Sequence, residues 1–182
     1  MENVEKATIA GGCFWCTEAI FKRLKGVEDV VSGYSGGQRQ NPSYEQVTTG
    51  ATGHAEAIQI EFDPRIISYK KLIEIFFYLH DPTTLNRQGA DEGTQYRSAI
   101  FYHNEKQRDE AESVRDEVAD SGTYKDPIIT EIVPYENFYT AEEYHQNYYE
   151  NNKEQGYCSY VIAPKLHKLL KEYSKEVKEE YK

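Results

Sequence analysis

The residues with the clearest chemical potential are two cysteines and the glycines before them, in the segment Gly-Gly-Cys-Phe-Trp-Cys at positions 11–16. The apolar residues 6–10 predict a strand, and a helical pattern follows the glycines, which places Cys13 where the helix begins. Free backbone N–H groups and the helix dipole at this position both favour the thiolate, which is the nucleophilic form of cysteine. Cys13 is therefore predicted to be reactive. The alternative, a small cysteine used only for core packing, fits poorly with flanking glycines and an adjacent Phe-Trp pair.

The other two cysteines suggest redox chemistry. Cys16 lies one turn further along the same helix and is either a redox partner of Cys13 or inert. Cys158 lies far away in the sequence, in a segment with Gly156 that we expect to be mobile. If Cys13 is oxidised to a sulfenic acid, a second thiol can condense with it to a disulfide and release water. Cys158 is the predicted resolving thiol.

Glu56 is the second candidate for chemistry, because of its position in a predicted strand. Residues 56, 58, 60 and 62 lie on one face of that strand, and the last three are Ile, Ile and Phe. A carboxyl group that faces an apolar core has a raised pKa and can donate a proton near neutral pH. The alternative is a strand-end glutamate that reaches solvent or pairs with Arg97.

Tyrosines and two long polar segments complete the candidate site. The chain contains 16 tyrosines, and a phenol hydroxyl can polarise a bound oxygen without adding permanent charge. Residues 34–53 and 80–97 are too long and too polar for ordinary connections, so they are functional or disordered. Their tyrosines and arginine, set among turn residues, favour an ordered site over disorder.

These residues must be positioned by a chain that alternates between strand and helix patterns. Strands are predicted at residues 6–10, 27–33, 55–62, 98–102 and 128–133. Helices are predicted after Cys13 and at 68–79, 104–122 and 140–151, with a last one from Pro164 towards the C-terminus. The order strand, helix, strand, strand, helix, strand predicts an α+β fold. We expect a two-layer sandwich with a ferredoxin-like β-α-β-β-α-β core, additional helices and long functional loops.

Length, charge and hydropathy restrict the class of protein. The 182 residues are expected to form a single catalytic domain, 1–182, and a monomer. A net charge of −10 argues against nucleic acid as a partner, and no apolar run is long enough to span a membrane. Three cysteines and the absence of an apolar signal segment indicate the cytoplasm.

Four segments together resemble the A-type peptide methionine sulfoxide reductases, which act on the S epimer of the sulfoxide. They are Gly-Cys-Phe-Trp at 12–15, Gly-His-Ala-Glu at 53–56, the run 80–98, and Gly-Tyr-Cys at 156–158. The resemblance covers about residues 7–164, and the C-terminal helix at about 164–182 lies outside its motifs.

The resemblance implies a role for each matching residue. Cys13 is the nucleophile, Glu56 the proton donor, and Tyr44 and Tyr96 bind the sulfoxide oxygen. The residues implied in substrate binding are Phe14 and Trp15 in the methyl pocket, the acidic Asp91, and Tyr148, with neighbouring Tyr149 as a rival. A sulfenic acid at Cys13 is then resolved to a disulfide that thioredoxin reduces, and no metal or organic cofactor is required.

Cys16 departs from the family pattern, which often has glycine there. The sulfenic acid can therefore be resolved by Cys158, by Cys16 or by both in turn, and the strain of a C-x-x-C disulfide at a helix start favours Cys158 first.

Two other classes of protein compete with this interpretation. A thioredoxin-like disulfide oxidoreductase would use Cys13 and Cys16 but leaves Glu56 unexplained, and a zinc-binding module using the three cysteines and His145 lacks paired ligand motifs.

Overall fold

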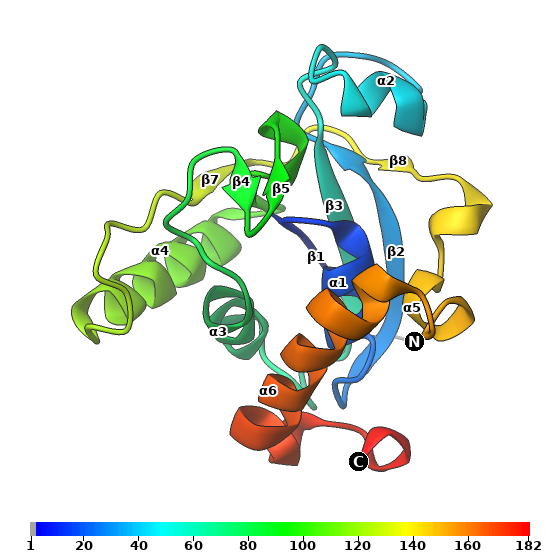
Figure 1. Cartoon of the computed structure of the whole chain (residues 1–182). Helices are drawn as coiled ribbons and strands as arrows, with labels where there is room; N and C mark the ends of the chain where they lie inside the picture. Colours follow the sequence, from blue (N-terminus) through cyan, green and yellow to red (C-terminus); the bar gives the residue numbers. More distant parts are fainter. Residues whose placement is uncertain (1–2) are drawn as a thin grey trace.

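A central six-stranded sheet organises the chain, whose computed structural model describes residues 3–182 (Figure 1). Its strands are β1 (Glu5–Gly11), β2 (Val27–Ser35), β3 (Ala55–Phe62), β6 (Ser98–Tyr102), β7 (Glu131–Pro134) and β8 (Tyr139–Thr140). The middle of the sheet has the order β6-β1-β3-β2, and every neighbouring pair there is antiparallel. This is the strand order of a ferredoxin-like core, as predicted. Strand β7 adds to β6 in parallel, and β8 adds to β2 antiparallel.

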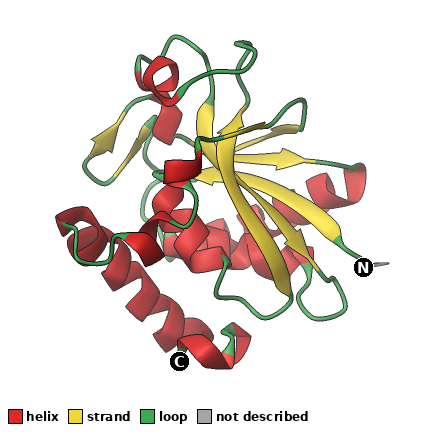
Figure 2. Ribbon diagram, turned by 90° about the vertical axis from the view of Figure 1, so that its right-hand side faces the viewer, coloured by secondary structure: helices red, strands yellow, loops and turns green. Residues whose placement is uncertain are grey.

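Four helices form a second layer on one face of this sheet (Figure 2). They are α1 (Phe14–Phe21), α3 (Tyr69–Leu79), α4 (Glu105–Asp120) and α6 (Ala163–Tyr173). The main core lies between the two layers and takes buried side chains from all four helices and from alternate positions of β1 and β3. Burying these apolar faces is what holds helices against a sheet, and the predicted two-layer sandwich is confirmed.

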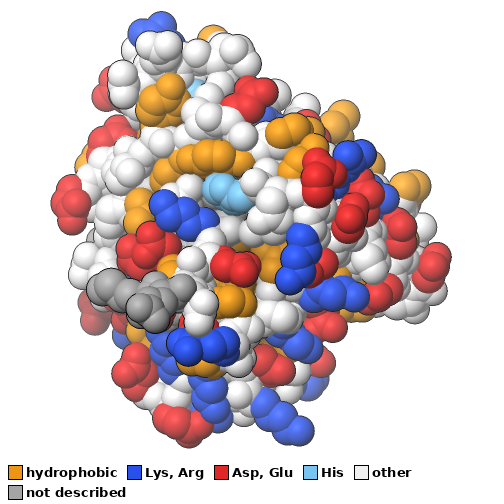
Figure 3. All heavy atoms as spheres, turned by 180° about the vertical axis from the view of Figure 1, so that it is seen from behind, with side chains coloured by type: hydrophobic (Ala, Val, Ile, Leu, Met, Phe, Trp, Pro, Cys, Tyr) orange, Lys and Arg blue, Asp and Glu red, His pale blue; other side chains and the backbone are white. Residues whose placement is uncertain are grey.

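The opposite face of the sheet carries smaller side chains. Ala10, Ala55, Ala57, Ala99 and Phe101 form a second buried cluster, partly covered by side chains that follow β6. From behind, hydrophobic side chains and a histidine gather over the middle of the molecule, with charged side chains around them (Figure 3). The alternation along β3 thus sends its alanines to this face and Glu56, with its isoleucines, to the helix side.

Two helix starts follow the sequence signals closely. The side chain of Ser68 accepts a hydrogen bond from the backbone N–H of Lys71 at the start of α3. The side chain of Asn104 does the same for Gln107 at the start of α4. Side-chain oxygens at these positions satisfy N–H groups that have no partner inside the helix.

The predicted helix at 140–151 is wrong. This segment instead contains β8, a short 3-10 turn η2 (Glu143–His145) and a single helical turn α5 (Tyr148–Asn151). The side-chain amide of Gln146 accepts from the backbone N–H of Ser32 and donates to its carbonyl, at 3.0 and 2.9 Å. Asn147 then adopts a left-handed conformation, with φ of 58°, that interrupts any continuous helix. Sheet pairing and these local contacts outweigh the helical pattern.

The segment around Cys158 is also more ordered than predicted. Cys158 begins a π-helical stretch, η3 (Cys158–Ile162), which continues directly into α6, and its side chain is fully buried. Packing of α6 against α1 and α3 explains this order.

After α6 the chain continues through two short 3-10 turns, η4 (Ser174–Glu176) and η5 (Glu179–Tyr181), and Val177 forms a bridge with Leu24. None of the helices described in 3–182 is both long and apolar enough to cross a membrane.

Candidate active site

Cys13 lies where the sequence predicted, between β1 and α1. It is the residue immediately before the first turn of α1, and its backbone is extended. Gly12 leads into it with φ of +90°, and a Cβ atom there would lie 2.6 Å from Cγ of Gln88. A glycine is therefore required both by backbone conformation and by space. This close approach places the short hairpin of β4 (Arg87–Gln88) and β5 (Asp91–Glu92) against the start of α1.

Glu56 is buried on the helix side of β3, as its strand position predicted. Only 2 % of its surface is exposed, and its Oε1 accepts a hydrogen bond of 3.1 Å from the backbone N–H of Phe14. Burial raises the pKa of Glu56 to about 8, with a smaller increase from the nearby Asp91. The guanidinium of Arg97 instead contacts the Gly53 carbonyl and the Glu131 carboxylate, so the alternative pairing with Glu56 does not occur. Glu56 thus holds a proton at neutral pH.

Cys13, directly before α1, and Cys16, within its first turn, affect each other's pKa, and burial opposes the thiolate predicted at Cys13. Burial, a hydrogen bond with Cys16 and the charge of Glu56 all raise the pKa of Cys13. The same hydrogen bond lowers the pKa of Cys16 to about 7, with further help from Lys165. The start of the helix alone would favour a thiolate at Cys13, but here desolvation outweighs it. Burial thus opposes the thiolate at Cys13.

Tyr44 and Tyr96 both lie within electrostatic range of Cys13 and Glu56. Tyr44 is the first residue of the short helix α2 (Tyr44–Thr48), whose start is capped by Ser43, and Tyr96 ends the turn η1 (Thr94–Tyr96). Burial raises the pKa of Tyr44 to about 12, and the charges of Glu56 and Cys13 add to the increase. The pKa of Tyr96 is raised by burial and by the same groups. Both phenols are half-buried and remain hydrogen-bond donors at every physiological pH.

Two residues from other parts of the chain, Glu142 and Tyr34, hold the backbone of Tyr44 in place. The backbone N–H of Tyr44 donates to Oε2 of Glu142 at 2.8 Å, and the hydroxyl of the buried Tyr34 donates to Oε1 of the same carboxylate at 2.9 Å. Neither Glu142 nor Tyr34 was identified from the sequence. Both long polar segments are therefore ordered parts of the site.

Asp91 reaches the site from β5 and has a partner that the sequence reasoning missed. The hydroxyl of Tyr157 donates to Oδ2 of Asp91 at 2.7 Å and lies 3.8 Å from Sγ of Cys16. Tyr157 thus joins the Asp91 carboxylate to the Cys16 thiol. Its position directly before Cys158 was the available signal, because the motif at 156–158 contains it.

An aromatic group lies beside the cysteine. The ring of Tyr148 stacks on Trp15 with centroids 3.6 Å apart and planes 6° from parallel. The indole N–H of Trp15 donates to Nδ1 of the buried His145 at 3.0 Å. Phe14 is fully buried behind them, against Tyr34 and His145. The structure therefore brings Trp15 and Tyr148 together and places Phe14 beneath them.

Cys158 lies in the same core cluster as the other two cysteines, and all three are free thiols. Burial raises its pKa, and the charge of Cys16 adds to this effect. Cys158 therefore lies within electrostatic range of Cys16.

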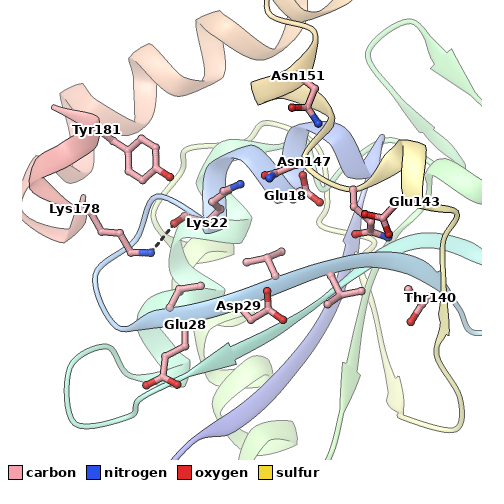
Figure 4. Close-up of a pocket in the computed structure, with 14 residues that line it drawn as sticks. Glu18, Lys22, Glu28, Asp29, Thr140, Glu143, Asn147, Asn151, Lys178 and Tyr181 are labelled. Atoms are coloured by element: carbon pink, nitrogen blue, oxygen red, sulfur yellow. Dashed lines mark hydrogen bonds between the residues drawn. The ribbon is translucent and has the colours of Figure 1, made fainter.

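A large groove lies outside this group of residues. An open groove of about 620 Å³ runs between β2, the segment 140–151 and the C-terminal residues (Figure 4). None of the predicted site residues lines it, although the buried Glu18 does. A search of residues 3–182 also finds no cluster of three or more His, Cys, Asp or Glu side chains placed to hold a metal ion. The zinc-module alternative thus has no geometric support in the part of the chain that the structure describes.

A cysteine at a helix start, a neighbouring thiol and a buried proton donor are the features of a thiol-dependent enzyme. The comparisons with known proteins agree. A family model described as peptide methionine sulfoxide reductase matches residues 5–178, which extends beyond the segment 7–164 that carries the resemblance. The chain belongs to this family and is an oxidoreductase that acts on methionine sulfoxide.

Relatives and solved structures support the assignment. The enzyme MsrA of Polynucleobacter asymbioticus is 51% identical over 181 residues, which cover 100% of this chain and 95% of the relative. The reduced form of Mxr1 from Saccharomyces cerevisiae is similar in structure, with a TM-score of 0.79, 36% identity and coverage of 86% of this chain and 90% of that one. Mxr1 in complex with Trx2 matches with a TM-score of 0.56 and 28% identity, over 81% and 86% of the two chains.

Proposed function

We propose that this enzyme reduces the S epimer of methionine sulfoxide, in proteins and as the free amino acid, with Cys13 as nucleophile and Glu56 as proton donor. The observation that carries this proposal is the hydrogen bond from Phe14 N–H to Glu56, because it fixes the acid next to the residue that follows Cys13. A sulfoxide sulfur is a poor electrophile until its oxygen gains a proton. Glu56, still protonated at neutral pH, supplies that proton.

In the first step, sulfur of Cys13 attacks the sulfoxide sulfur while the oxygen takes a proton. The net reaction converts the Cys13 thiol and the sulfoxide into a sulfenic acid and methionine, so that the oxygen atom passes to Cys13 and the methionine sulfur is reduced. The proton that Cys13 gives up restores Glu56. The hydroxyls of Tyr44 and Tyr96 donate to the oxygen as charge develops on it, which the burial of both phenols makes more effective.

The substrate side chain would lie against the aromatic group. Trp15 and Tyr148, with Phe14 beneath, offer an apolar surface for the methyl group of the sulfoxide. Asp91, oriented by Tyr157, would bind the polar part of the substrate or a water molecule. Tyr148 is preferred to Tyr149 in this role, because the ring of Tyr148 is the one stacked on Trp15.

The recycling of Cys13 uses both other cysteines, and we place Cys16 first. Cys16 already contacts Cys13 and has the lower pKa of the pair, whereas Cys158 is fully buried in a helical segment. Attack of Cys16 on the sulfenic acid gives a Cys13–Cys16 disulfide and water. Attack of Cys158 on the Cys16 sulfur then releases the Cys13 thiol and leaves a Cys16–Cys158 disulfide. This order differs from the expectation that Cys158 acts first.

Thioredoxin is the proposed reductant of the final disulfide, which returns to two thiols while the thioredoxin dithiol is oxidised. The complex of the structurally similar Mxr1 with Trx2, a thioredoxin, supports this choice. No metal or organic cofactor has a step in this scheme.

The proposal is tested by supplying the two epimers of a blocked methionine sulfoxide separately, with dithiothreitol, and separating the products by chromatography. We expect turnover of the S epimer alone. Turnover of the R epimer, or of neither epimer while insulin disulfides are reduced, would contradict the proposal. The second result would favour the thioredoxin-like oxidoreductase that uses Cys13 and Cys16.

We further propose that residues 1–182 act as one monomeric catalytic domain in the cytoplasm. The C-terminal residues support the first part, since Val177 pairs with Leu24 beside α1. Three free thiols support a reducing compartment. Sedimentation analysis and fractionation of the source cells test these points, and recovery of the enzyme with exported proteins would contradict the location.

A further inference from the structure

Glu18 is a buried acidic residue that the reaction scheme does not use. It lies on α1, three residues after Trp15, and only 3 % of its surface is exposed. Burial raises its pKa to about 7, while hydrogen bonds oppose that increase. Burying a carboxyl group costs free energy unless its oxygens accept hydrogen bonds. The contacts of Glu18 therefore indicate its structural role.

Those contacts join three elements. The hydroxyl of Ser32 on β2 donates to Oε2 of Glu18 at 3.1 Å. The backbone N–H groups of Asn147 and Tyr148 lie close enough to the Glu18 carboxyl to lower its pKa. Figure 4 shows Glu18 and Asn147 side by side at one end of the groove. Because Asn147 is in the left-handed conformation and begins a helix of one turn, its N–H and the next have no partner within that helix.

The segment that Glu18 holds carries the aromatic wall of the candidate site. His145 accepts the indole N–H of Trp15, Gln146 pairs with the Ser32 backbone, and Tyr148 stacks on Trp15. Ser32 connects Glu18 to this segment, because its hydroxyl donates to Glu18 and its backbone pairs with Gln146, two residues before Tyr148. The position of the Tyr148 ring over Trp15 is thus supported from α1 through Glu18 and Ser32.

We propose that Glu18 is a positioning residue for substrate binding, which keeps Tyr148 stacked on Trp15. This inference rests on the proposed role of these two rings as the methyl pocket. Without the carboxyl, the hydroxyl of the buried Ser32 loses its acceptor and the segment 146–148 loses the carboxyl group beside its backbone, so that this segment shifts. The cost falls on binding of the sulfoxide, because Glu18 touches neither Cys13 nor Glu56 in any contact described for residues 3–182.

The chain offers a direct optical readout, since Trp15 is its only tryptophan. The test compares Glu18→Gln, which keeps an acceptor at the same distance, with Glu18→Asp, which shortens the side chain by one methylene group, and Glu18→Leu, which removes the acceptor. We expect Glu18→Gln to keep the wild-type emission spectrum and a KM within twofold. We expect the other two to shift the emission of Trp15 and to raise KM for the sulfoxide roughly tenfold, with kcat of the dithiothreitol-supported reaction changed less than threefold.

A matched control separates positioning from loss of stability. Val114→Ala removes buried side-chain volume from α4, away from Trp15 and the segment 146–148, and is expected to lower Tm without changing the emission spectrum or KM. Equal KM changes in Val114→Ala and Glu18→Asp, or unchanged emission in the folded Glu18→Asp and Glu18→Leu variants, would overturn the proposal. Shifted emission with unchanged KM would instead refute the assignment of the Trp15 and Tyr148 pair to the substrate pocket, and with it the role of Glu18 in binding.

Discussion

The backbone N–H of Phe14 donates a hydrogen bond of 3.1 Å to the carboxyl of Glu56, which lies 42 residues away in the sequence. This contact joins the start of the cysteine helix to the buried face of β3. A shift of α1 would therefore disturb Cys13 and the Glu56 carboxyl together. The separation of the proposed nucleophile from the proposed acid is set by the packing of α1 on the sheet rather than by a loop.

Glu56→Gln should lower the rate of the first turnover by roughly 10²- to 10⁴-fold, because it removes the general acid and keeps the size of the side chain. The raised pKa of about 8 means that the Glu56 carboxyl of the wild-type enzyme carries a proton below that pH and is ionised above it. The acid-dependent part of the single-turnover rate should therefore fall above about pH 8, and Glu56→Gln should lack that fall. Rapid-quench measurement of methionine formation checks both effects.

Glu61→Gln is the matched control for this prediction, since Glu61 lies on β3 at a position that faces away from Glu56. It should leave the pH profile unchanged. If the single-turnover rate of Glu56→Gln still falls above about pH 8, the proton donor is another group.

Cys13→Ser should abolish methionine formation even in a single turnover, since a serine hydroxyl is a far weaker nucleophile than the cysteine sulfur. Methionine is measured after mixing enzyme with excess sulfoxide and no reductant. The wild-type enzyme should form methionine in amounts comparable to the enzyme concentration. Methionine formation by Cys13→Ser would show that Cys16 or Cys158 can attack the substrate.

Cys16→Ser and Cys158→Ser should stop recycling at different points. Cys16→Ser should accumulate the Cys13 sulfenic acid, because its nearest thiol is gone, and dimedone should label it. Cys158→Ser should instead give a Cys13–Cys16 disulfide after one turnover and lose thioredoxin-supported cycling. Mass spectrometry of digested protein distinguishes these products. A Cys13–Cys158 disulfide as the first product in the wild-type enzyme would reverse the proposed order.

Tyr44→Phe and Tyr96→Phe should each lower the first-turnover rate by roughly 10²-fold, the usual effect of removing one donor to a developing oxyanion. The rings keep their packing, so Tm should change little. Tyr160→Phe is the control, since that side chain is 85% exposed. Equal rates in the Tyr44→Phe variant and the control would remove Tyr44 from the catalytic group.

Strand parity and helix signals were enough to predict much of this molecule. The buried face of Glu56 followed from alternation along one strand, and the position of Cys13 followed from two glycines between a strand and a helix pattern. Both are local properties of the chain. The order of the central strands followed in turn from the order of elements along the sequence.

What could not be predicted depends on contacts between distant segments. The helix expected at 140–151 was replaced by pairing with β2, and the segment of Cys158 was ordered by packing on α1 and α3. The link from Tyr157 to Asp91 spans 66 residues, and no local pattern records it. The protonation of Cys13 likewise depended on burial, which opposes the effect of the helix start.

The side-chain amide of Gln146 has one more consequence. Together with the backbone N–H of Ala141, it satisfies the backbone groups of Ser32 where the ladder between β8 and the outer edge of β2 ends. Exposed strand edges are the usual starting points for intermolecular pairing and aggregation. A single amide at this position thus occupies the backbone groups of Ser32 through which another strand could add to β2.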